Sequence, residues 1–160
     1  MDDFEQLKKA VDELKDIEAL KQLKARYCHL VDARRWEDLG KLFTEDATCD
    51  YGFFGTYNGR NEIINKFFGE LTNAAASFMC HMVHNPLIEV SGDTASASWY
   101  LTAQTTIEPM KQAVWVMGVY YDEFKRVGGA WKFTALKFDF WYYTPYEQGW
   151  ARMPMWEIPR

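Results

Sequence analysis

The spacing of apolar residues divides the chain into a helical first part and a strand-rich second part. Residues 4–34 place apolar side chains at three- and four-residue steps, with charges between them and no Pro or Gly. This period predicts a long amphipathic helix. Residues 36–43 predict a second, short helix, and residues 60–72 return to helical spacing. Between these helices, glycines, an Asn-Gly pair and β-forming residues indicate a short strand and turns.

After residue 77 the pattern changes to strands. We predict four long strands joined by segments that are short enough for hairpins. They are residues 79–90, 95–107, 113–127 and 130–143. Helices followed by antiparallel strands predict an α+β fold, in which the helices pack on one face of a curved antiparallel sheet and leave a cone with a mouth and an interior. We expect one domain over residues 1–160, with 144–160 as an irregular but packed C-terminal tail.

Composition narrows the classes of function. Aromatic residues make up 17% of the 160-residue chain, which predicts either a bulky core or an apolar cavity. The net charge of −5 argues against a nucleic-acid partner, which needs a basic face, and against an anionic membrane surface. No apolar run approaches the ~18 residues that a membrane-spanning helix needs. No GxGxxG or P-loop motif occurs, and we expect neither a metal nor an organic cofactor.

The cysteines and the N-terminus predict a cytoplasmic protein. Cys28, Cys49 and Cys80 are an odd number with no CxxC pair, which favours free thiols in a reducing compartment. The N-terminal run MDDFEQLKK is acidic and lacks the apolar region of a signal peptide.

The segment FMCHMVHNP holds two of the three histidines, His81 and His84, three residues apart. Side chains alternate between the two faces of a strand, so this spacing puts the two rings on opposite faces. A shared metal site, which an HxxH pair can begin on a helix, is therefore not expected. At most one of the two histidines is catalytic, and composition alone leaves open that both are core residues.

Asp32 lies near the C-terminal end of the first predicted helix, beside an apolar stripe. A carboxylate there faces the negative end of the helix dipole, so it needs a cation or a donor nearby. Two interpretations are open: an ion pair with Arg34 or Arg35 at the surface, or the orientation of a histidine that acts as a general base. Tyr27 flanks Asp32 on the helix, and Tyr51 follows the first predicted strand. Phenols that point into an apolar cavity can donate hydrogen bonds to a developing enolate oxygen.

Three segments carry a resemblance to a known family: IEALKQLKARYCHLVDARRWEDLGKLFTEDATCDYG, FMCHMVHNP and WKFTALKFDFWY. Over most of residues 15–143 the chain resembles a SnoaL-like domain of the NTF2-like superfamily, above all scytalone dehydratase and the bile acid 7α-dehydratases. The resemblance implies a single NTF2-like cone that encloses a pocket. By position, Asp32 matches the acid that holds the catalytic histidine, and His81 matches that histidine. Tyr27 matches a tyrosine of the bile acid enzymes, and Tyr51 matches one that grips the substrate carbonyl in scytalone dehydratase.

The chain departs from both enzymes elsewhere in the pocket. Scytalone dehydratase has a second pocket histidine, and this chain has Thr105 or Gln104 in roughly that position. Gly118 and Tyr120 align with a serine and an asparagine of that enzyme. Ala103 stands where the bile acid enzymes carry an acid, and their arginine of the last strand is missing. We therefore expect a substrate that is neither scytalone nor a bile acid conjugate.

The residues that remain predict a cofactor-independent dehydratase, a lyase that removes water from a hydrophobic cyclic or polycyclic β-hydroxy carbonyl compound. His81, oriented by Asp32, would take the proton, while Tyr51 and Tyr27 would bond the enolate oxygen. The expected substrate-binding residues are Phe53, Phe54, Phe67, Gly118, Tyr120, Phe138 and Phe140. Gly118 is expected to leave room for the substrate, and Tyr120 to add a donor.

Other functions use the same parts. A ketosteroid-type isomerase or another proton-transfer enzyme needs the same base and phenols. A binding module would hold a hydrophobic small molecule without chemistry. A structural subunit, like the β subunits of ring-hydroxylating dioxygenases, would share the cone shape.

One face of a predicted strand favours a homo-oligomer. The odd-numbered positions of residues 113–125 are too apolar to face water, so helices or a second subunit must cover them. These positions hold Trp115, Met117, Val119 and Tyr121. The resembling dehydratases are trimers, so a trimer is favoured, with a dimer as the alternative.

Overall fold

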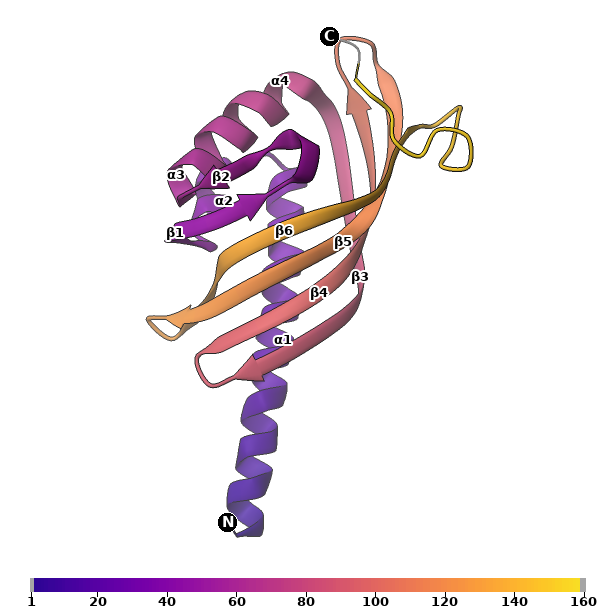
Figure 1. Cartoon of the computed structure of the whole chain (residues 1–160). Coiled ribbons are helices and arrows are strands. Elements are labelled where there is room, and N and C mark those ends of the chain that lie inside the picture. Colours follow the sequence, from indigo (N-terminus) through magenta and orange to yellow (C-terminus); the bar gives the residue numbers. More distant parts are fainter. Residues whose placement is uncertain (1, 159–160) are drawn as a thin grey trace.

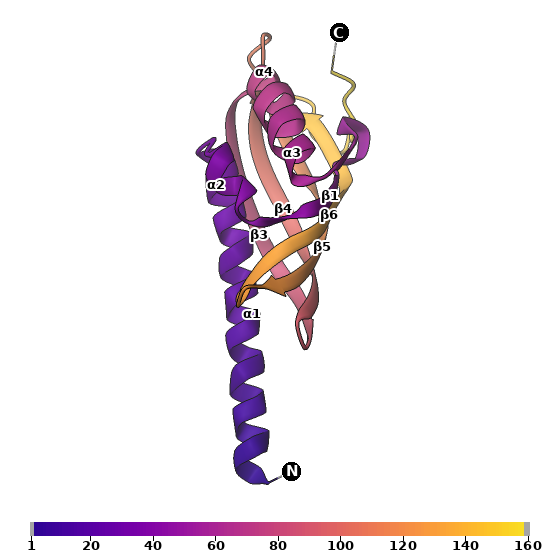
Figure 2. The same ribbon diagram turned by 90° about the vertical axis from the view of Figure 1, so that its left-hand side faces the viewer.

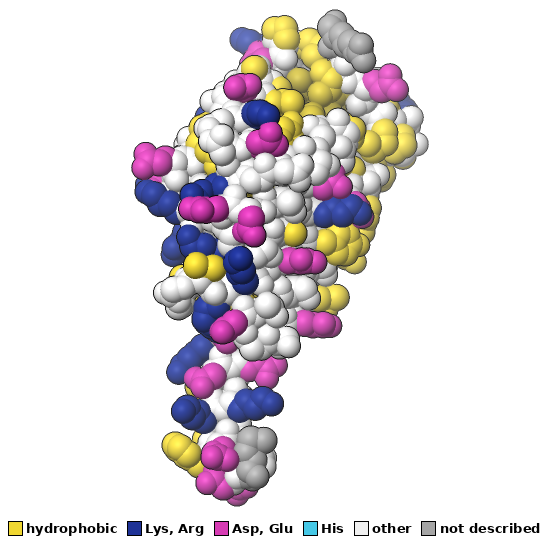
Figure 3. All heavy atoms as spheres, turned by 60° about the vertical axis from the view of Figure 1, so that its left-hand side comes forward, with side chains coloured by type: hydrophobic (Ala, Val, Ile, Leu, Met, Phe, Trp, Pro, Cys, Tyr) yellow, Lys and Arg dark blue, Asp and Glu magenta, His cyan; other side chains and the backbone are white. Residues whose placement is uncertain are grey.

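The first element of the protein is a long helix that lies partly outside the body of the fold. The computed structural model describes residues 2–158. Helix α1 (Asp3–Asp32) has 30 residues, which confirms the long predicted helix, and Asp2 caps it by accepting a hydrogen bond from the Glu5 N–H. Its N-terminal half projects beyond the sheet, and its C-terminal half runs along the sheet (Figures 1 and 2). Figure 3 shows charged side chains of both signs around the projecting half.

Asp16 fastens α1 to the sheet where the projecting half ends. Its carboxylate accepts hydrogen bonds from Arg126 Nη2, at 2.8 and 2.9 Å, and from the Trp131 indole N–H at 3.1 Å. Beyond Asp16 the apolar stripe of α1 is buried, beginning at Leu20 and ending at Val31. The packed half of α1 therefore carries Asp32 to a fixed place at the end of the helix.

Several short elements follow α1. They are α2 (Trp36–Gly40), β1 (Phe43–Asp50), η1 (Gly52–Phe54), β2 (Thr56–Asn58), α3 (Arg60–Glu62), η2 (Ile63–Thr72) and α4 (Asn73–Ala75). The helix predicted over 36–43 ends earlier than expected, because Phe43 already belongs to β1. The helix predicted over 60–72 is present, but η2 within it is a π-helix. Apolar pairs four residues apart suit the wider π turn as well as an α turn, so the spacing could not separate the two.

The long predicted strands are confirmed as β3 (Ala76–Ser91), β4 (Thr94–Ile107), β5 (Gln112–Val127) and β6 (Ala130–Pro145). They form one six-stranded sheet with β1 and β2, in the order β2-β1-β6-β5-β4-β3. The prediction of a wholly antiparallel sheet is wrong in one place, because β1 pairs with β6 in parallel. Hairpin signals report only neighbours in sequence, and β1 lies in the helical first part of the chain, far from β6 in sequence. The sheet curves, and the helices lie on its inner side (Figure 2).

Aromatic side chains fill the space between α1 and the inner face of the sheet. Tyr27 makes ring contacts with Phe43, Phe68, Tyr120 and Phe133, at centroid separations of 5.6–6.4 Å. The high aromatic content therefore serves the core as well as the cavity described below. No helix within residues 2–158 is long and apolar enough to cross a membrane.

The outer face of the sheet and the tail carry exposed rings. Figure 1 looks onto this face, and no helix lies over its central strands. Tyr121 on β5 and Trp141 on β6 are each 48% exposed there, whereas Val119 is buried, so the apolar set predicted on β5 is uncovered only in part. In the tail, Trp156 stacks on Tyr143, as a packed tail requires, but Trp150 is 60% exposed. Trp150 stacks on Tyr142, so both tail tryptophans contact rings of β6, although Trp150 stays largely exposed.

Candidate active site

The end of α1 and the middle of β3 bring Asp32 and His81 together. The Asp32 Oδ1 and His81 Nδ1 atoms are 2.6 Å apart, and the His81 backbone N–H donates to Asp32 Oδ2 at 3.0 Å. An ionised carboxylate only accepts hydrogen bonds, so the neutral imidazole tautomer that fits this contact has the proton on Nδ1 and the lone pair on Nε2. Two bonds to one carboxylate fix the position and the orientation of the imidazole. This pair can orient a general base.

The arginines near Asp32 bond elsewhere. Arg34 donates to the Asn73 Oδ1 at 2.8 Å and to the Ala76 carbonyl, and Arg35 pairs with Asp38. The surface ion pair that the sequence left open for Asp32 is therefore not the arrangement that forms. The Asp32 side chain is 26% exposed and the His81 side chain 15%.

His84 lies on the other face of β3, as strand alternation predicts. Its Nε2 atom is 3.1 Å from the Thr102 Oγ1, and its ring meets Tyr100 edge-on. Neither neighbour is a carboxylate, and His84 does not line the cavity that His81 faces. Within residues 2–158 no group of three or more His, Cys, Asp and Glu side chains is placed to hold a metal ion.

His81 lines an apolar cavity of about 120 Å³ between the helices and the inner face of the sheet. Most of the residues predicted for the site also line it. They are Tyr27, Tyr51, Phe54, Phe67, Tyr120, Phe138 and Phe140. Asp32 stands behind His81, outside the lining. The cavity is thus a largely hydrocarbon space into which one imidazole and several phenols project.

Two residues predicted for the wall do not line the cavity. Phe53 is 52% exposed and packs on the far side of Phe54 and Phe140, at centroid separations of 4.4 and 4.5 Å. At Gly118, an added Cβ would lie 2.2 Å from the Asp139 carbonyl oxygen. The absence of a side chain there lets β6 approach at a register shift, so Gly118 makes room for backbone and not for a substrate.

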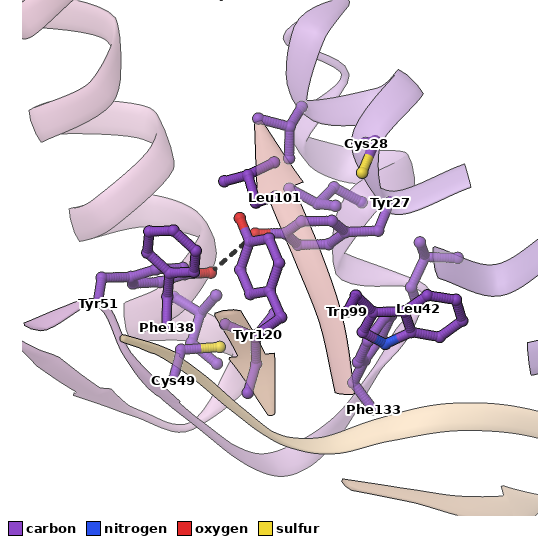
Figure 4. Close-up of a cluster of buried hydrophobic side chains, with 14 of the residues drawn as sticks. Tyr27, Cys28, Leu42, Cys49, Tyr51, Trp99, Leu101, Tyr120, Phe133 and Phe138 are labelled. Carbon is purple, nitrogen blue, oxygen red and sulfur yellow. Dashed lines mark hydrogen bonds between the residues drawn. The ribbon is translucent and has the colours of Figure 1, made fainter. Parts of the chain in front are cut away.

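Tyr27, Tyr51 and Tyr120 all line the cavity, and their phenols lie close together (Figure 4). The Tyr27 and Tyr51 hydroxyl oxygens are 3.3 Å apart, and the Tyr120 hydroxyl points toward this pair. The three phenols carry three hydroxyl hydrogens, and the contacts of Tyr27 with Tyr51 and Tyr120 use two of them, so one hydrogen remains for a ligand or for the neighbouring Cys49 thiol. Burial raises the pKa of each of these three phenols well above its ordinary value, so they stay neutral donors.

A buried ion pair that sequence reasoning missed lies beneath the phenols. Lys24 Nζ is 2.8 Å from Asp122 Oδ2, and both side chains are fully buried. The same ammonium lies 3.5 Å from the Tyr120 ring centroid and 4.8 Å from that of Tyr27. An ammonium over the face of an aromatic ring is attracted by the ring, so these two contacts help to stabilise the buried charge. A signal existed, because Lys24 falls in the buried stripe between Leu20 and Tyr27.

Comparison with known proteins identifies the family of the chain. The family model of the SnoaL-like domain matches residues 12–137. The chain belongs to the SnoaL-like family. An uncharacterised protein of Mycobacterium tuberculosis is 31% identical over 124 residues, which are 77% of this chain and 84% of that protein.

Solved structures support the fold of this SnoaL-like chain. A type-3 hexachlorocyclohexane dehydrochlorinase, LinA, from Novosphingobium barchaimii has a TM-score of 0.79 and 24% identity, covering 85% of this chain and 93% of the other. A candidate scytalone dehydratase from Novosphingobium aromaticivorans has a TM-score of 0.76 and 24% identity, covering 84% and 89%. At these identities the likeness shows the fold alone. The expected NTF2-like cone, α+β with N-terminal helices on a curved sheet, is confirmed.

Proposed function

We propose that the protein is a cofactor-independent lyase that eliminates water from a hydrophobic cyclic β-hydroxy carbonyl compound. The observation that carries the proposal is the Asp32–His81 pair, in which one carboxylate bonds both the ring and the backbone of a histidine that faces an apolar cavity. The membership of the SnoaL-like family is consistent with it. SnoaL-like and NTF2-like chains host several chemistries, so the residues of the site decide among them.

The first step of the proposed reaction is the removal of a proton. His81 Nε2 takes the proton from the carbon next to the substrate carbonyl, and the carbonyl oxygen becomes an enolate. Asp32 stabilises the imidazolium that forms, since its carboxylate holds the Nδ1–H. A phenol of the Tyr27, Tyr51 and Tyr120 group donates to the enolate oxygen, where the negative charge develops.

The second step releases water. The enolate electrons re-form the carbonyl and a carbon–carbon double bond, while the carbon–oxygen bond to the β-hydroxyl breaks. His81 returns its proton to the leaving hydroxyl, so the base ends the cycle neutral. Because one imidazole serves both carbons, the proton and the hydroxyl leave from the same face of the substrate.

Elimination of chloride is the second candidate. A type-3 LinA hexachlorocyclohexane dehydrochlorinase has the same fold, and loss of a proton and a chloride needs the same oriented base. A chlorinated alkane has no oxygen that becomes an enolate, however, and so gives the phenols no charge to stabilise. The phenol group therefore favours a carbonyl substrate and places water loss first. Ketosteroid-type isomerisation shares the first step and differs in the absence of released water.

The proposal is tested with 3-hydroxy-1-tetralone, a small bicyclic β-hydroxy ketone whose dehydration gives fluorescent 1-naphthol. We expect the wild type to form 1-naphthol faster than buffer, and His81→Ala to lower the rate by about a hundredfold to ten-thousandfold. In D₂O, exchange at the carbon next to the carbonyl without 1-naphthol would favour an isomerase. If the wild type gives neither product nor exchange with this ketone and larger ring analogues, the dehydratase proposal fails and a binding role leads.

Two further properties are proposed with the function. We place the protein in the cytoplasm, because all three cysteines are free thiols, with Cys28 and Cys49 buried. We also propose a homo-oligomer, with a trimer favoured over a dimer, in which a second copy covers the exposed rings of Tyr121 and Trp141. Light scattering that gives a monomer mass would contradict this assembly.

A further inference from the structure

A row of four residues crosses the inner face of the sheet. His81 on β3 pairs with Ala103 on β4, Ala103 pairs with Val116 on β5, and Val116 pairs with Tyr143 on β6. All four line the cavity. Ala103 and Val116 have short side chains, so they leave space between the longer side chains of His81 and Tyr143. His81 and Tyr143 therefore stand on opposite walls of the cavity.

The Tyr143 hydroxyl is a buried donor with no partner. Tyr143 is 2% exposed, and its hydroxyl makes no hydrogen bond with any group of residues 2–158. Four other residues there have buried polar side-chain atoms without a hydrogen bond, namely Lys24, Thr44, Trp99 and Asp122. None of these four lines the cavity, and Lys24 and Asp122 face each other as an ion pair. Among residues 2–158, Tyr143 is therefore the one that lines the cavity and has a buried side-chain hydroxyl without a hydrogen bond.

The Tyr143 ring is held in place from two sides. Phe53, Phe54 and Phe140 make edge contacts with it, and Trp156 of the tail stacks on it at 6.2 Å with an interplanar angle of 9°. The backbone is held as well, since the Tyr143 N–H donates to the Pro154 carbonyl and the Trp156 N–H donates to the Tyr143 carbonyl, both at 2.8 Å. An unbonded buried hydroxyl costs stability, so a rigidly positioned one indicates a use in binding.

We propose that the Tyr143 hydroxyl donates a hydrogen bond to a second oxygen of the substrate, at the end away from the carbon that His81 deprotonates. The proposal rests on the proposed function only for the place of the reacting carbon. Neighbouring strands are about 4.8 Å apart, so three spacings put the backbones of the two walls about 14 Å apart on a flat sheet. The curvature of the sheet and the two side chains shorten this distance, so a ring ketone with an oxygen on its far side can reach both walls. The substrate class is therefore a ring ketone with an ether, carbonyl or hydroxyl oxygen on its far side.

Two matched ligands test the far-end contact. 6-Methoxy-1-tetralone carries a second acceptor oxygen across the ring system from its carbonyl, and 6-ethyl-1-tetralone has a methylene in place of that oxygen. Neither has a β-hydroxyl, so neither reacts, and calorimetry measures binding alone. We expect the wild type to bind the methoxy ketone about three- to tenfold more tightly than the ethyl ketone. Tyr143→Phe should bind both with the lower affinity, and should melt at the same temperature as the wild type or higher, since an unbonded hydroxyl is removed.

Tyr142→Phe is the matched control, because Tyr142 stacks on Trp150 outside the cavity and should keep the wild-type preference. Equal affinities of the wild type for the two ketones would overturn the proposal, as would a Tyr143→Phe variant that keeps the preference. So would a Tyr143→Phe variant that melts several degrees lower, because its hydroxyl would then be structural. Preference without turnover of 3-hydroxy-1-tetralone would leave the Tyr143 contact standing and remove only the proposed elimination.

Discussion

His81 and His84 lie three residues apart on one strand, yet they differ in their hydrogen-bond partners and in whether they line the cavity. His81 faces the inner side of the sheet, where Asp32 bonds both its ring and its backbone and where the cavity begins. His84 faces the outer side and shares a hydrogen bond with the neutral hydroxyl of Thr102. Residue type and strand alone therefore do not decide which of the two histidines is placed to act as the proposed general base. The end of a helix and an enclosed apolar space supply what His84 lacks.

The two faces of the sheet differ in the same way. Rings on the inner face line the cavity together with a few polar groups, such as the Tyr51 hydroxyl, which contacts that of Tyr27. Rings on the outer face, such as Trp141, are about half exposed to solvent. Aromatic residues therefore serve two purposes here: they line an apolar cavity inside, and they leave an apolar surface outside.

The largest effect on activity is expected from removing the Asp32 carboxylate, which bonds His81 and not His84. Asp32→Asn keeps the size of the side chain but loses the charge that would stabilise the imidazolium. Its amide N–H can also donate to Nδ1, which favours the tautomer with the proton on Nε2, where the proposed base needs a lone pair. We expect the rate of 1-naphthol formation to fall by about a hundredfold, with the affinity for 6-methoxy-1-tetralone unchanged. Asp38→Asn is the control, since Asp38 pairs with Arg35 and Lys41 away from the cavity. A loss of less than threefold in Asp32→Asn would contradict the role of the pair.

Strand alternation makes half of this comparison predictable from the sequence. The period of two is enough to put His81 and His84 on opposite faces, and the four long strands are predicted with ends within a few residues of those observed. The contact between Asp32 and His81 is different in kind, because it depends on how α1 packs across β3. Spacing along the chain holds no information about that packing, and only the resemblance to the dehydratases indicates it.

Other parts of the site are not predictable from the sequence for physical reasons. Lys24 falls in the buried stripe of the helix, but a buried lysine needs a partner, and that partner, Asp122, lies in another element. Gly118 is predicted for the substrate wall, whereas close approach of the β6 backbone demands it. Tyr143 ends a predicted strand, and only the register across β4 and β5 places it opposite His81.

A smaller effect is expected where α1 is fastened to the sheet. Partial burial works to raise the pKa of Asp16, but hydrogen bonds from Arg126 and Trp131 outweigh it and hold the pKa below its ordinary value. A lowered pKa means that Asp16 stabilises the fold above the carboxyl's unfolded pKa near 4, and that this contribution is lost as the pH falls through the lower folded value. We expect Asp16→Asn to lower the free energy of unfolding at pH 7 by about 1 kcal/mol, because the pair is partly exposed.

The measurement is urea unfolding of Asp16→Asn and the wild type at pH 7 and at successively lower pH. The difference between the two proteins should shrink as the pH falls, because protonation removes the charge from Asp16 in the wild type as well. Asp12→Asn is the control, since Asp12 pairs with the exposed Lys15 one turn away. A difference that stays constant down to about pH 2 would show that the charge of Asp16 does not contribute.

The smallest effect should come from His84. Its bond to Thr102 is partly exposed and joins two neighbouring strands that already pair through their backbones. Removing one such bond in His84→Ala should lower the free energy of unfolding by about 1 kcal/mol or less. The rate of 1-naphthol formation should stay within about twofold of the wild type, because His84 touches neither the cavity nor Asp32. If His84→Ala loses as much activity as His81→Ala while it remains folded, the two faces of β3 are not chemically separate, and the choice of His81 as the base is wrong.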